Sequence, residues 1–519
     1  MSGNGNGAQP QYDYLIIGAG PAGLQLAYCL EKAGRSYLVL EAGEGPGDFF
    51  KKYPRHRKLI SINKVYTGSD DPEFNMRMDW NSLLSDSDRM LFKHYSKSYF
   101  PHADTIVRYL EDYATHFDLK VKCNVRVVNV SKADHFELTD DAGQTYTSRR
   151  LVVATGVAPY VPEIPGIELV EQYSDVSVDP QDFVNQRVLV LGKGNSAFET
   201  ADNLVETAAT IHIASPSPLK LAWKSHFVGH LRAVNNNILD TYLLKLQNGL
   251  IDGTVDRIER NEDGKLVVHF SYTRAPGATG SYEYDRVIAC VGFRFDDSMF
   301  DETCKPAKKI SGRFPALTSE WESTNVEGLY FAGTLTQSRD YKKTMSGFIH
   351  GFRFNVVGLH RILEEKYHGT RWPSRPVEPT PRAISEAIFE RLNRAASLWQ
   401  QPGFFCDYIE LTEDGAVYHD DVPVDYVREG ELGRRPHYLV TLEYGPDYPD
   451  YPFEFIRYTE AHEAHLNPQL HPIVRRYEGG EVVAEHHIME DLEANWKGDF
   501  FTRPLVSFLE QQVADEVLA

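Results

Sequence analysis

Two apolar strands that each run into a glycine-rich loop predict an α/β fold with two Rossmann-like dinucleotide-binding domains. The first, YDYLIIGAGPAG, begins at Tyr12, and the second, RVLVLGKGNSA, begins at Arg187. A third observation is the proline-rich stretch WPSRPVEPTPR, after which an amphipathic helix and short strands follow. This change of pattern predicts a smaller α+β domain at the C-terminal end of the chain.

The composition is typical of a globular protein with an acidic surface. The 519 residues suffice for roughly two to four domains. A net charge of −20 and a pI of about 5.4 argue against nucleic acid or an anionic membrane as the main partner. There is no long apolar run, so we expect no membrane insertion.

The chain ends and the cysteines bear on the cellular compartment. Residues 1–11 are polar and glycine-rich, which predicts a disordered tail rather than a signal peptide. The five cysteines are widely spaced and form no C-x-x-C motif. We therefore expect a cytoplasmic protein without a dithiol redox centre.

The first loop has the full pattern of a dinucleotide-binding turn. Gly18 permits the tight turn, Gly20 lets the backbone approach a pyrophosphate, and Gly23 lets the helix pack on the strand. Glu41 ends the next strand, where an acid accepts the ribose hydroxyls. A glycine-rich turn without a ligand is the alternative interpretation.

The second loop carries the accepted variant of the same motif. Gly192 and Gly194 are followed by Ala197 at the third place, and Asn195 and Ser196 open the helix. Two loops predict two nucleotides, one of them a hydride donor.

The strand after the second loop, IHIASPSPLK, ends without an acid. An acid there would repel a 2′-phosphate, so its absence favours NADPH over NADH. Ser215, Ser217 and Lys220 are candidates to bind the phosphate, and Lys193 to lie over the pyrophosphate. Each is equally well explained as a solvated surface residue.

Two further motifs complete a recognisable set. Ala154-Thr155-Gly156 ends a buried strand, and GLYFAGT contains Gly333 and Thr334. In this order the motifs resemble those of the two-dinucleotide-binding flavoproteins, especially the flavin-containing monooxygenases. The resemblance implies FAD on the first loop and NADPH on the second. The domains expected from it are FAD-binding (12–165 and 316–367), NADPH-binding (166–315), a linker (368–382) and C-terminal α+β (383–519).

Some stretches are closer to one group. YPRHRKLISINK, GNSAFETADNL, HLRAVNNNILDTYLLK and DYKKTMSGFIHGFR resemble the FAD-dependent oxidoreductase domain proteins of the ERFAD type. Eukaryotic members of that group have an ER signal and a retention tail, which we do not find in this sequence. The F-x-G-x-x-x-H motif that the flavin-containing and Baeyer–Villiger monooxygenases usually show before the NADPH loop is also missing.

The resemblance implies that NADPH reduces the flavin and that oxygen is transferred to a small molecule through a C4a-peroxyflavin. Asn63 falls where the family places an asparagine beside the flavin, and Arg55 is a candidate to contact FAD or a substrate anion. A turn-forming asparagine and a solvated basic run are the alternatives. Arg339, Lys342 and Lys343 form a second basic cluster, with a charged surface loop as the favoured interpretation.

The C-terminal part is rich in histidine, but its spacing does not specify a metal site, and we predict none. The histidines concerned are His462, His465, His471, His486 and His487.

Three functions remain open. The first is an NADPH-dependent FAD monooxygenase, with a small molecule and O₂ as partners. The second is an NADPH-dependent reductase that passes electrons to a protein or quinone, and the third is a non-enzymatic flavoprotein. The presence of two loops favours an enzyme, and the motif order favours the monooxygenase. The sequence leaves open whether the chain forms a homo-oligomer.

Overall fold

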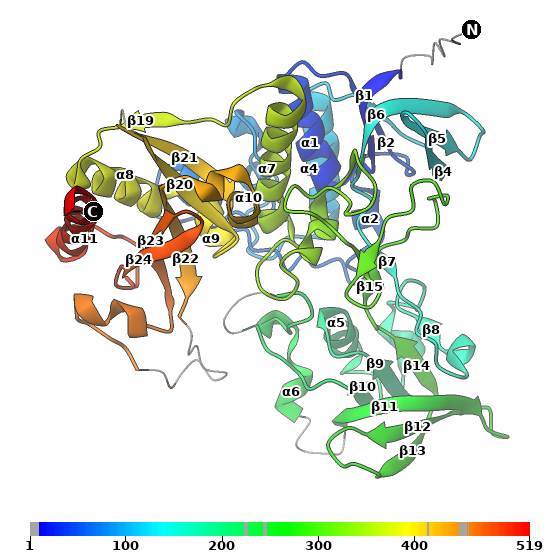
Figure 1. Cartoon of the computed structure of the whole chain (residues 1–519). Helices are drawn as coiled ribbons and strands as arrows, with labels where there is room; N and C mark the ends of the chain where they lie inside the picture. Colours follow the sequence, from blue (N-terminus) through cyan, green and yellow to red (C-terminus); the bar gives the residue numbers. More distant parts are fainter. Residues whose placement is uncertain are drawn as a thin grey trace, which may run out of the picture.

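The computed structural model describes residues 10–222, 227–241, 247–412, 415–445, 454 and 456–518. Within this part of the chain, three large sheets are each accompanied by helices (Figure 1). Parallel strands lead into both glycine loops, which confirms the predicted α/β class. We refer to the first unit, the second unit and the C-terminal unit by these sheets.

The first unit is built on a sheet in the order β3-β2-β1-β6-β5-β4, with β18 beside β6. The C-terminal halves of its central strands, residues 14–17 and 151–153, are apolar and buried, as expected where both faces of a parallel sheet are covered. The helix α1 packs against α4 and α7. The strands are β1 (Tyr12–Ile17), β2 (Tyr37–Leu40), β3 (Val121–Lys122), β4 (Val127–Lys132), β5 (Phe136–Asp140), β6 (Thr145–Val153) and β18 (Leu329–Phe331). The helices are α1 (Pro21–Lys32), α2 (Asp48–Lys52), α3 (Pro72–Met76), η1 (Asp88–Met90), η2 (Phe92–His94), α4 (Ala103–His116), η7 (Gly333–Ser338) and α7 (Ile349–His368).

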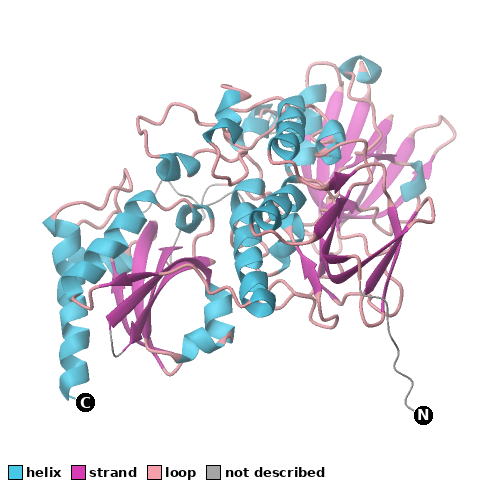
Figure 2. Cartoon of the chain, turned by 90° about the horizontal axis from the view of Figure 1, so that it is seen from above, coloured by secondary structure: helices cyan, strands magenta, loops and turns pink. Residues whose placement is uncertain are grey.

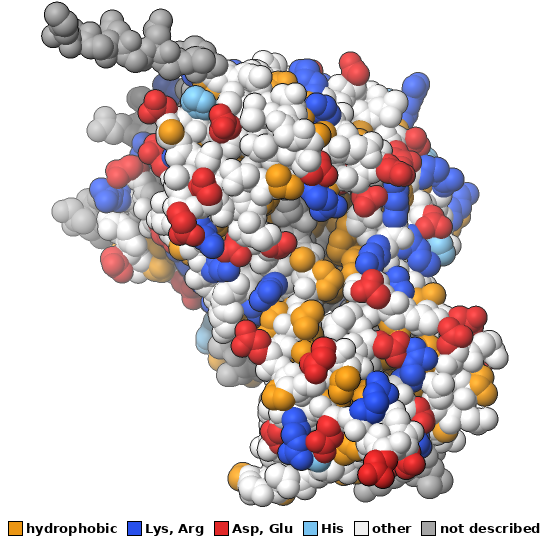
Figure 3. All heavy atoms as spheres, turned by 90° about the vertical axis from the view of Figure 1, so that its right-hand side faces the viewer, with side chains coloured by type: hydrophobic (Ala, Val, Ile, Leu, Met, Phe, Trp, Pro, Cys, Tyr) orange, Lys and Arg blue, Asp and Glu red, His pale blue; other side chains and the backbone are white. Residues whose placement is uncertain are grey.

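The second unit is inserted between β6 and β18, and its sheet has the order β13-β12-β11-β10-β9-β14-β8. Acidic and basic side chains are interspersed over the face shown in Figure 3. The strands are β8 (Glu171–Gln172), β9 (Arg187–Leu191), β10 (Thr210–Ser215), β11 (Asn248–Arg260), β12 (Leu266–Tyr272), β13 (Thr279–Tyr284) and β14 (Arg286–Ala289). The helices are η3 (Ile167–Leu169), η4 (Pro180–Phe183), α5 (Asn195–Leu204), η5 (Ala233–Asn235) and α6 (Ile238–Thr241).

The two chain crossings between these units run side by side. The outgoing strand β7 (Ala158–Pro159) pairs in antiparallel fashion with the returning strand β15 (Phe293–Arg294). A short hairpin, β16 (Lys308–Lys309) and β17 (Phe314–Pro315), follows before β18. The insertion is therefore attached to the first unit through a two-stranded ribbon.

The C-terminal unit is a six-stranded sheet in the order β19-β21-β20-β22-β23-β24. The hairpin predicted around Gly479 is confirmed, whereas the segment expected as a linker contributes β19 to the sheet. The predicted amphipathic helix is split at Ala395 into two helices. The strands are β19 (Arg375–Val377), β20 (Phe405–Thr412), β21 (Gly415–Pro423), β22 (His437–Tyr444), β23 (Leu470–Glu478) and β24 (Glu481–His487). The helices are α8 (Pro381–Arg394), α9 (Ser397–Gln400), α10 (Val424–Glu429), η8 (Glu431–Arg434), η9 (Ala461–Leu466) and α11 (Asp499–Leu518).

The C-terminal unit is docked firmly on the first unit. Figure 2 shows its sheet on one side of a group of helices and the remaining sheets on the other side. The Arg77 guanidinium donates to the carbonyls of Leu392 and Ala395, and one hydrophobic cluster continues from α7 to Phe405. None of the described helices is both long enough and apolar enough to cross a bilayer.

Candidate functional site

The first glycine loop is shaped by contacts that exclude a side chain at two positions. Gly18 has φ +104°, and a Cβ there would lie 2.7 Å from the Ala154 carbonyl oxygen. A Cβ on Gly23 would lie 1.9 Å from the Gly18 oxygen. Gly20 differs, because a Cβ there would meet nothing within 4 Å, and it precedes α1 without a side-chain cap. The result is an open cradle at a helix N-terminus, which fits a pyrophosphate.

The other predicted residues of the first unit converge on this loop. The buried Glu41 carboxylate accepts hydrogen bonds from the backbone N–H groups of Ala19 (2.6 Å) and Gly43 (2.7 Å). A Cβ on Gly333 would lie 2.7 Å from the Ala22 Cβ, so the last motif packs on the first turn of α1. A carboxylate that can accept from ribose hydroxyls, beside backbone N–H groups that can donate to phosphate, fits the adenosine half of FAD.

Two residues of these motifs lie at the margin of the cradle. Gly156 follows β6 with φ +67° and open space around it. The Thr334 hydroxyl donates to the Gly347 carbonyl at 3.5 Å and so connects η7 to the start of α7.

The second loop repeats the geometry of the first. Gly192 has φ +111°, and a Cβ there would lie 2.2 Å from the Cys290 oxygen. Around Gly194 the nearest atom is the Gly229 Cα at 4.0 Å, and α5 begins without a side-chain cap. Ser196 lies in the first turn of α5, and Ala197 is fully buried beneath it. This loop therefore fits a second dinucleotide.

The residues predicted to bind phosphate beside the second loop have different surroundings. Lys193 is buried, and its ammonium pairs with Asp252 on β11 rather than lying over the loop. Its Nζ is also 3.4 Å from the Ser215 carbonyl oxygen. The Ser215 hydroxyl accepts from the Ser217 N–H, and the Lys220 side chain is exposed. Sequence reasoning missed Asp252, because it lies on the strand beyond the one searched for an acid.

Asn195 connects the second loop to the first unit. Its amide donates to the His230 carbonyl at 2.8 Å, and its Oδ1 accepts from the Arg232 N–H at 2.9 Å. The Arg232 guanidinium donates to the Ile60 carbonyl at 2.8 Å and lies over the Trp80 ring. Arg232 was not predicted from sequence, since only the fold shows that it reaches the other unit.

Five residues near the contacts between the units are called the junction cluster. They are Asn63, Trp80, Arg232, Ser346 and His350. Asn63 is 2% exposed, and its amide donates to the carbonyls of Ser96 (2.7 Å) and Ser98 (3.1 Å). Trp80 stacks on His350 with ring centroids 4.1 Å apart. The sequence predicted a packed helix histidine at 350, and the structure buries it on α7.

The C-terminal unit also reaches the junction cluster. The buried Gln401 amide donates to the Ser346 hydroxyl at 2.9 Å and to the Asn355 Oδ1 at 2.6 Å. Its Oε1 accepts from the Met345 N–H at 3.0 Å. All three units therefore contribute residues to one largely buried region.

Arg55 is placed at a contact between the first and second units. Its guanidinium donates to the Val176 carbonyl at 2.6 Å, and its backbone N–H lies 3.4 Å from the Tyr173 hydroxyl. Tyr53 stacks on Tyr173 just before it. The structure thus gives this segment a role in holding the units together, and a catalytic role for Arg55 stays a prediction.

Arg339 was predicted as part of a basic cluster, and its guanidinium forms ion pairs with acidic side chains. Its guanidinium pairs with Asp425 and with Glu429 at 2.6 Å, both on α10 of the C-terminal unit. The adjacent Asp340 is buried, and this burial raises the pKa of its carboxyl to about 6. Arg339 therefore contributes to docking of the C-terminal unit.

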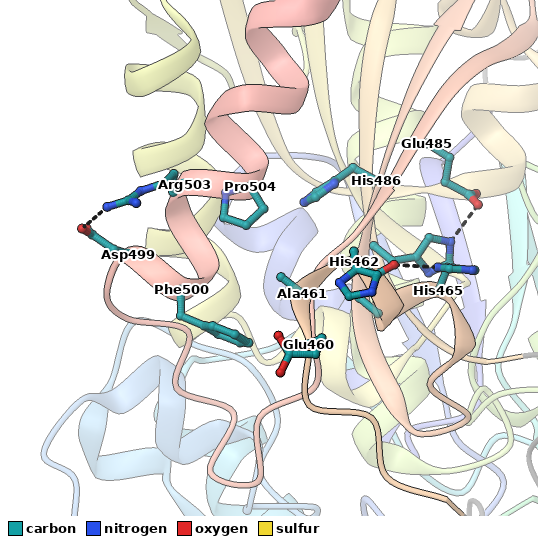
Figure 4. Close-up of a pocket in the computed structure, with 12 residues that line it drawn as sticks. Glu460, Ala461, His462, His465, Glu485, His486, Asp499, Phe500, Arg503 and Pro504 are labelled. Carbon is teal, nitrogen blue, oxygen red and sulfur yellow. Dashed lines mark hydrogen bonds and ion pairs between the residues drawn. The ribbon is translucent and has the colours of Figure 1, made fainter.

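A hollow of about 820 Å³ lies in the C-terminal unit, between η9, β24 and the start of α11 (Figure 4). It is lined by Glu460, His462, His465, His486 and Arg503 among others. Among the residues that the structure describes, no group of histidine, cysteine or acidic side chains is arranged to hold a metal ion. None of the residues predicted for nucleotide binding lines this hollow.

Comparison with known proteins defines the class. The chain belongs to the pyridine nucleotide-disulphide oxidoreductase family, whose model matches residues 15–333. The match includes both glycine loops and ends at the last glycine motif. The chain is therefore a member of an FAD-dependent oxidoreductase family, as the order of the motifs predicted.

The chain is also similar to individual proteins, one compared by sequence and two by structure. FAD-dependent oxidoreductase domain-containing protein 2 of Mus musculus is 38% identical over 97% of this chain and 84% of its own length. The flavin-containing monooxygenase from Stenotrophomonas maltophilia matches 68% of this chain and 98% of its own, with 20% identity and a TM-score of 0.53. The bacillithiol disulfide reductase Bdr from Bacillus cereus matches 68% of this chain and 99% of its own, with 19% identity and a TM-score of 0.53. The two structural likenesses show the fold alone.

Proposed function

We propose that the chain is an NADPH-dependent FAD monooxygenase that oxygenates a small molecule. The observation that supports this proposal is the burial of most of the junction cluster, to which all three units contribute. Trp80 is 8% exposed and His350 is 1% exposed. Oxygen transfer requires a site from which water is excluded. A reductase that serves a protein acceptor requires an open flavin edge instead.

FAD, when bound, accepts a hydride from NADPH and activates O₂. The residues of the chain bind and orient. The Gly20 backbone and the N-terminus of α1 would hold the FAD pyrophosphate, and Glu41 would accept hydrogen bonds from the ribose hydroxyls. The open space at Gly194 would hold the NADPH pyrophosphate. Asn195 holds Arg232 against the first unit, which keeps the two nucleotide sites in register.

The C-terminal unit supplies a wall to the same site. Gln401 holds the segment from Met345 to Ser346, directly before α7. We assign this unit the task of keeping water out of the junction cluster.

A second candidate is a reductase with an external acceptor, since a disulfide reductase has the same fold. The five cysteines are all free, and Cys290, Cys304 and Cys406 are buried. An acceptor disulfide or quinone would then have to come from outside the chain.

Two matched glycine variants test the nucleotide assignment. Gly20→Ala adds a methyl group that meets no protein atom within 4 Å, so the fold is expected to persist while FAD affinity falls roughly tenfold or more. Gly194→Ala is expected to retain FAD and to lose reduction by NADPH. Flavin content and anaerobic reduction rates measure both effects. If Gly194→Ala loses FAD instead, the assignment of the loops is reversed.

The reaction type is tested by reducing the FAD-loaded protein anaerobically with NADPH and then mixing it with O₂. A transient absorbance spectrum that matches neither oxidised nor reduced flavin is expected. Immediate return of the oxidised spectrum with stoichiometric release of hydrogen peroxide, with and without candidate amines and thioethers, would contradict the monooxygenase and favour the reductase.

A further inference from the structure

Three charged side chains meet beside the second loop, where the parallel strands β9 and β10 end and β11 continues past them. The side chain of Lys193 is only 4% exposed, and its ammonium pairs with one Asp252 oxygen. The other Asp252 oxygen is 2.7 Å from Arg274 Nε. We call this set the Lys193–Asp252–Arg274 cluster.

The cluster lies where a nucleotide ribose is expected. Ser215 ends β10, and the register of the parallel strands places Asp252 directly beside it. Ligands of open α/β sheets bind outside the carboxyl ends of the strands. The residue after the second strand normally meets the adenosine ribose, and here that position lies against Asp252 and Lys193. The sequence predicted no acid at this position, but Asp252 of the next strand places one there, and Lys193 and Arg274 both pair with it.

We infer that Lys193 and Arg274 bind the 2′-phosphate of the second nucleotide and that Asp252 is the residue that sets its specificity. This inference rests on the proposed assignment of the second loop to NADPH. Two cations and one carboxylate leave a net charge of +1, which favours a dianionic phosphate over a neutral hydroxyl. Asp252 holds both cations in position in the free protein and competes with the phosphate for them.

Of the three residues predicted from sequence to bind the phosphate, Ser215 and Lys220 are less well suited to this task. The Ser215 hydroxyl already accepts a hydrogen bond from the Ser217 N–H at 3.3 Å. Lys220 is exposed, and its carbonyl is fixed by the Leu231 N–H. Lys220→Gln therefore serves as the test of the rival assignment.

The experiment measures binding of 2′,5′-ADP and 5′-AMP to the FAD-loaded protein by titration calorimetry. These probes differ only in the 2′-phosphate, and binding is read without turnover. Arg274 is 70% exposed, so Arg274→Gln is expected to leave the fold intact and to weaken 2′,5′-ADP about 3- to 10-fold, with 5′-AMP unchanged. Asp252→Asn is expected to tighten 2′,5′-ADP about 3- to 10-fold, because a competing carboxylate is removed.

The matched control is Arg257→Gln, on the same strand as Asp252. Its guanidinium is 54% exposed and pairs with Glu259, so the same loss of charge is expected to change neither affinity. Equal effects of Arg274→Gln and Arg257→Gln, or a loss confined to Lys220→Gln, would overturn the inference. So would equal affinity of the wild-type protein for both probes. Failure of oxygenation leaves these affinity ratios untouched, so the two proposals fail separately.

Discussion

At the scale of single residues, Glu199 is the titratable group with the clearest consequence. It lies on α5 of the second unit, where its Oε2 accepts a hydrogen bond from the Tyr173 hydroxyl at 3.2 Å. Burial raises the pKa of its carboxyl from 4.5 to about 7. Tyr173 also contacts Arg55, so this carboxyl lies at the contact between the first and second units.

Glu199 should make stability fall as the pH rises. The unfolded chain releases this proton near pH 4.5 and the folded protein near pH 7, so the folded state binds more protons between these values. The free energy of unfolding is therefore expected to fall by up to about 3 kcal/mol across this window. Glu199→Gln should remove this loss, which urea unfolding at pH 5 and pH 8 would measure.

The control for this prediction is Glu206→Gln, an exposed position just after α5. Its pH dependence should follow that of the wild-type protein. A Glu199→Gln protein whose stability falls with pH as steeply as the wild type would show that another group is responsible.

Asn195 offers a test of the connection between the loops. Asn195→Ala removes the hydrogen bonds to His230 and Arg232, and the loss of each bond costs about 1 kcal/mol of stability. We expect flavin reduction by NADPH to slow roughly tenfold while FAD content is unchanged. Asn203→Ala, which removes a single bond to Val178 further along the same helix, should reduce at the wild-type rate. Stopped-flow absorbance measures both.

At the scale of elements, α8 is fixed by a buried charge network. Arg391 pairs with Asp407 (2.9 Å) and Asp421 (2.6 Å) of its own unit and with Glu73 on α3 of the first unit. Asp420 lies 3.6 Å from the same guanidinium, so four carboxylates share it. Arg391→Gln should therefore lower the free energy of unfolding by about 3–5 kcal/mol. Arg382→Gln, which breaks an exposed pair with Glu386 on the same helix, should cost less than about 0.5 kcal/mol. Urea unfolding compares the two.

Local sequence signals were sufficient to predict the strands, turn and helix around the first loop. The positions of Gly18, Gly23 and Glu41 follow from strand, turn and helix patterns within about thirty residues. The contacts of Lys193 and Arg232 could not be predicted, because their partners lie on other strands or in another unit. The strand β19 was missed since its prolines suggested a linker, yet Pro376 pairs with Val417 at the sheet edge.

At the scale of the whole molecule, the C-terminal unit is expected to control water access to the junction cluster. Gln401→Ala removes hydrogen bonds to Met345, Ser346 and Asn355. We expect more hydrogen peroxide released per NADPH consumed, which a peroxidase-coupled assay measures. Arg394 of the C-terminal unit pairs with Asp71 of the first unit at 2.6 Å, so Arg394→Gln weakens docking elsewhere and should leave this ratio unchanged. A rise in both variants would indicate that loosened docking is the cause.

The ribbon formed by β7 and β15 allows the second unit to be replaced without changing the rest of the chain. Because the second unit leaves and re-enters at adjacent strands, its ends can be joined by a short turn at little entropic cost. The second unit can therefore be removed or exchanged as one continuous segment. Homologous recombination could replace it with another module, and the first unit would keep its own sheet and its own glycine loop.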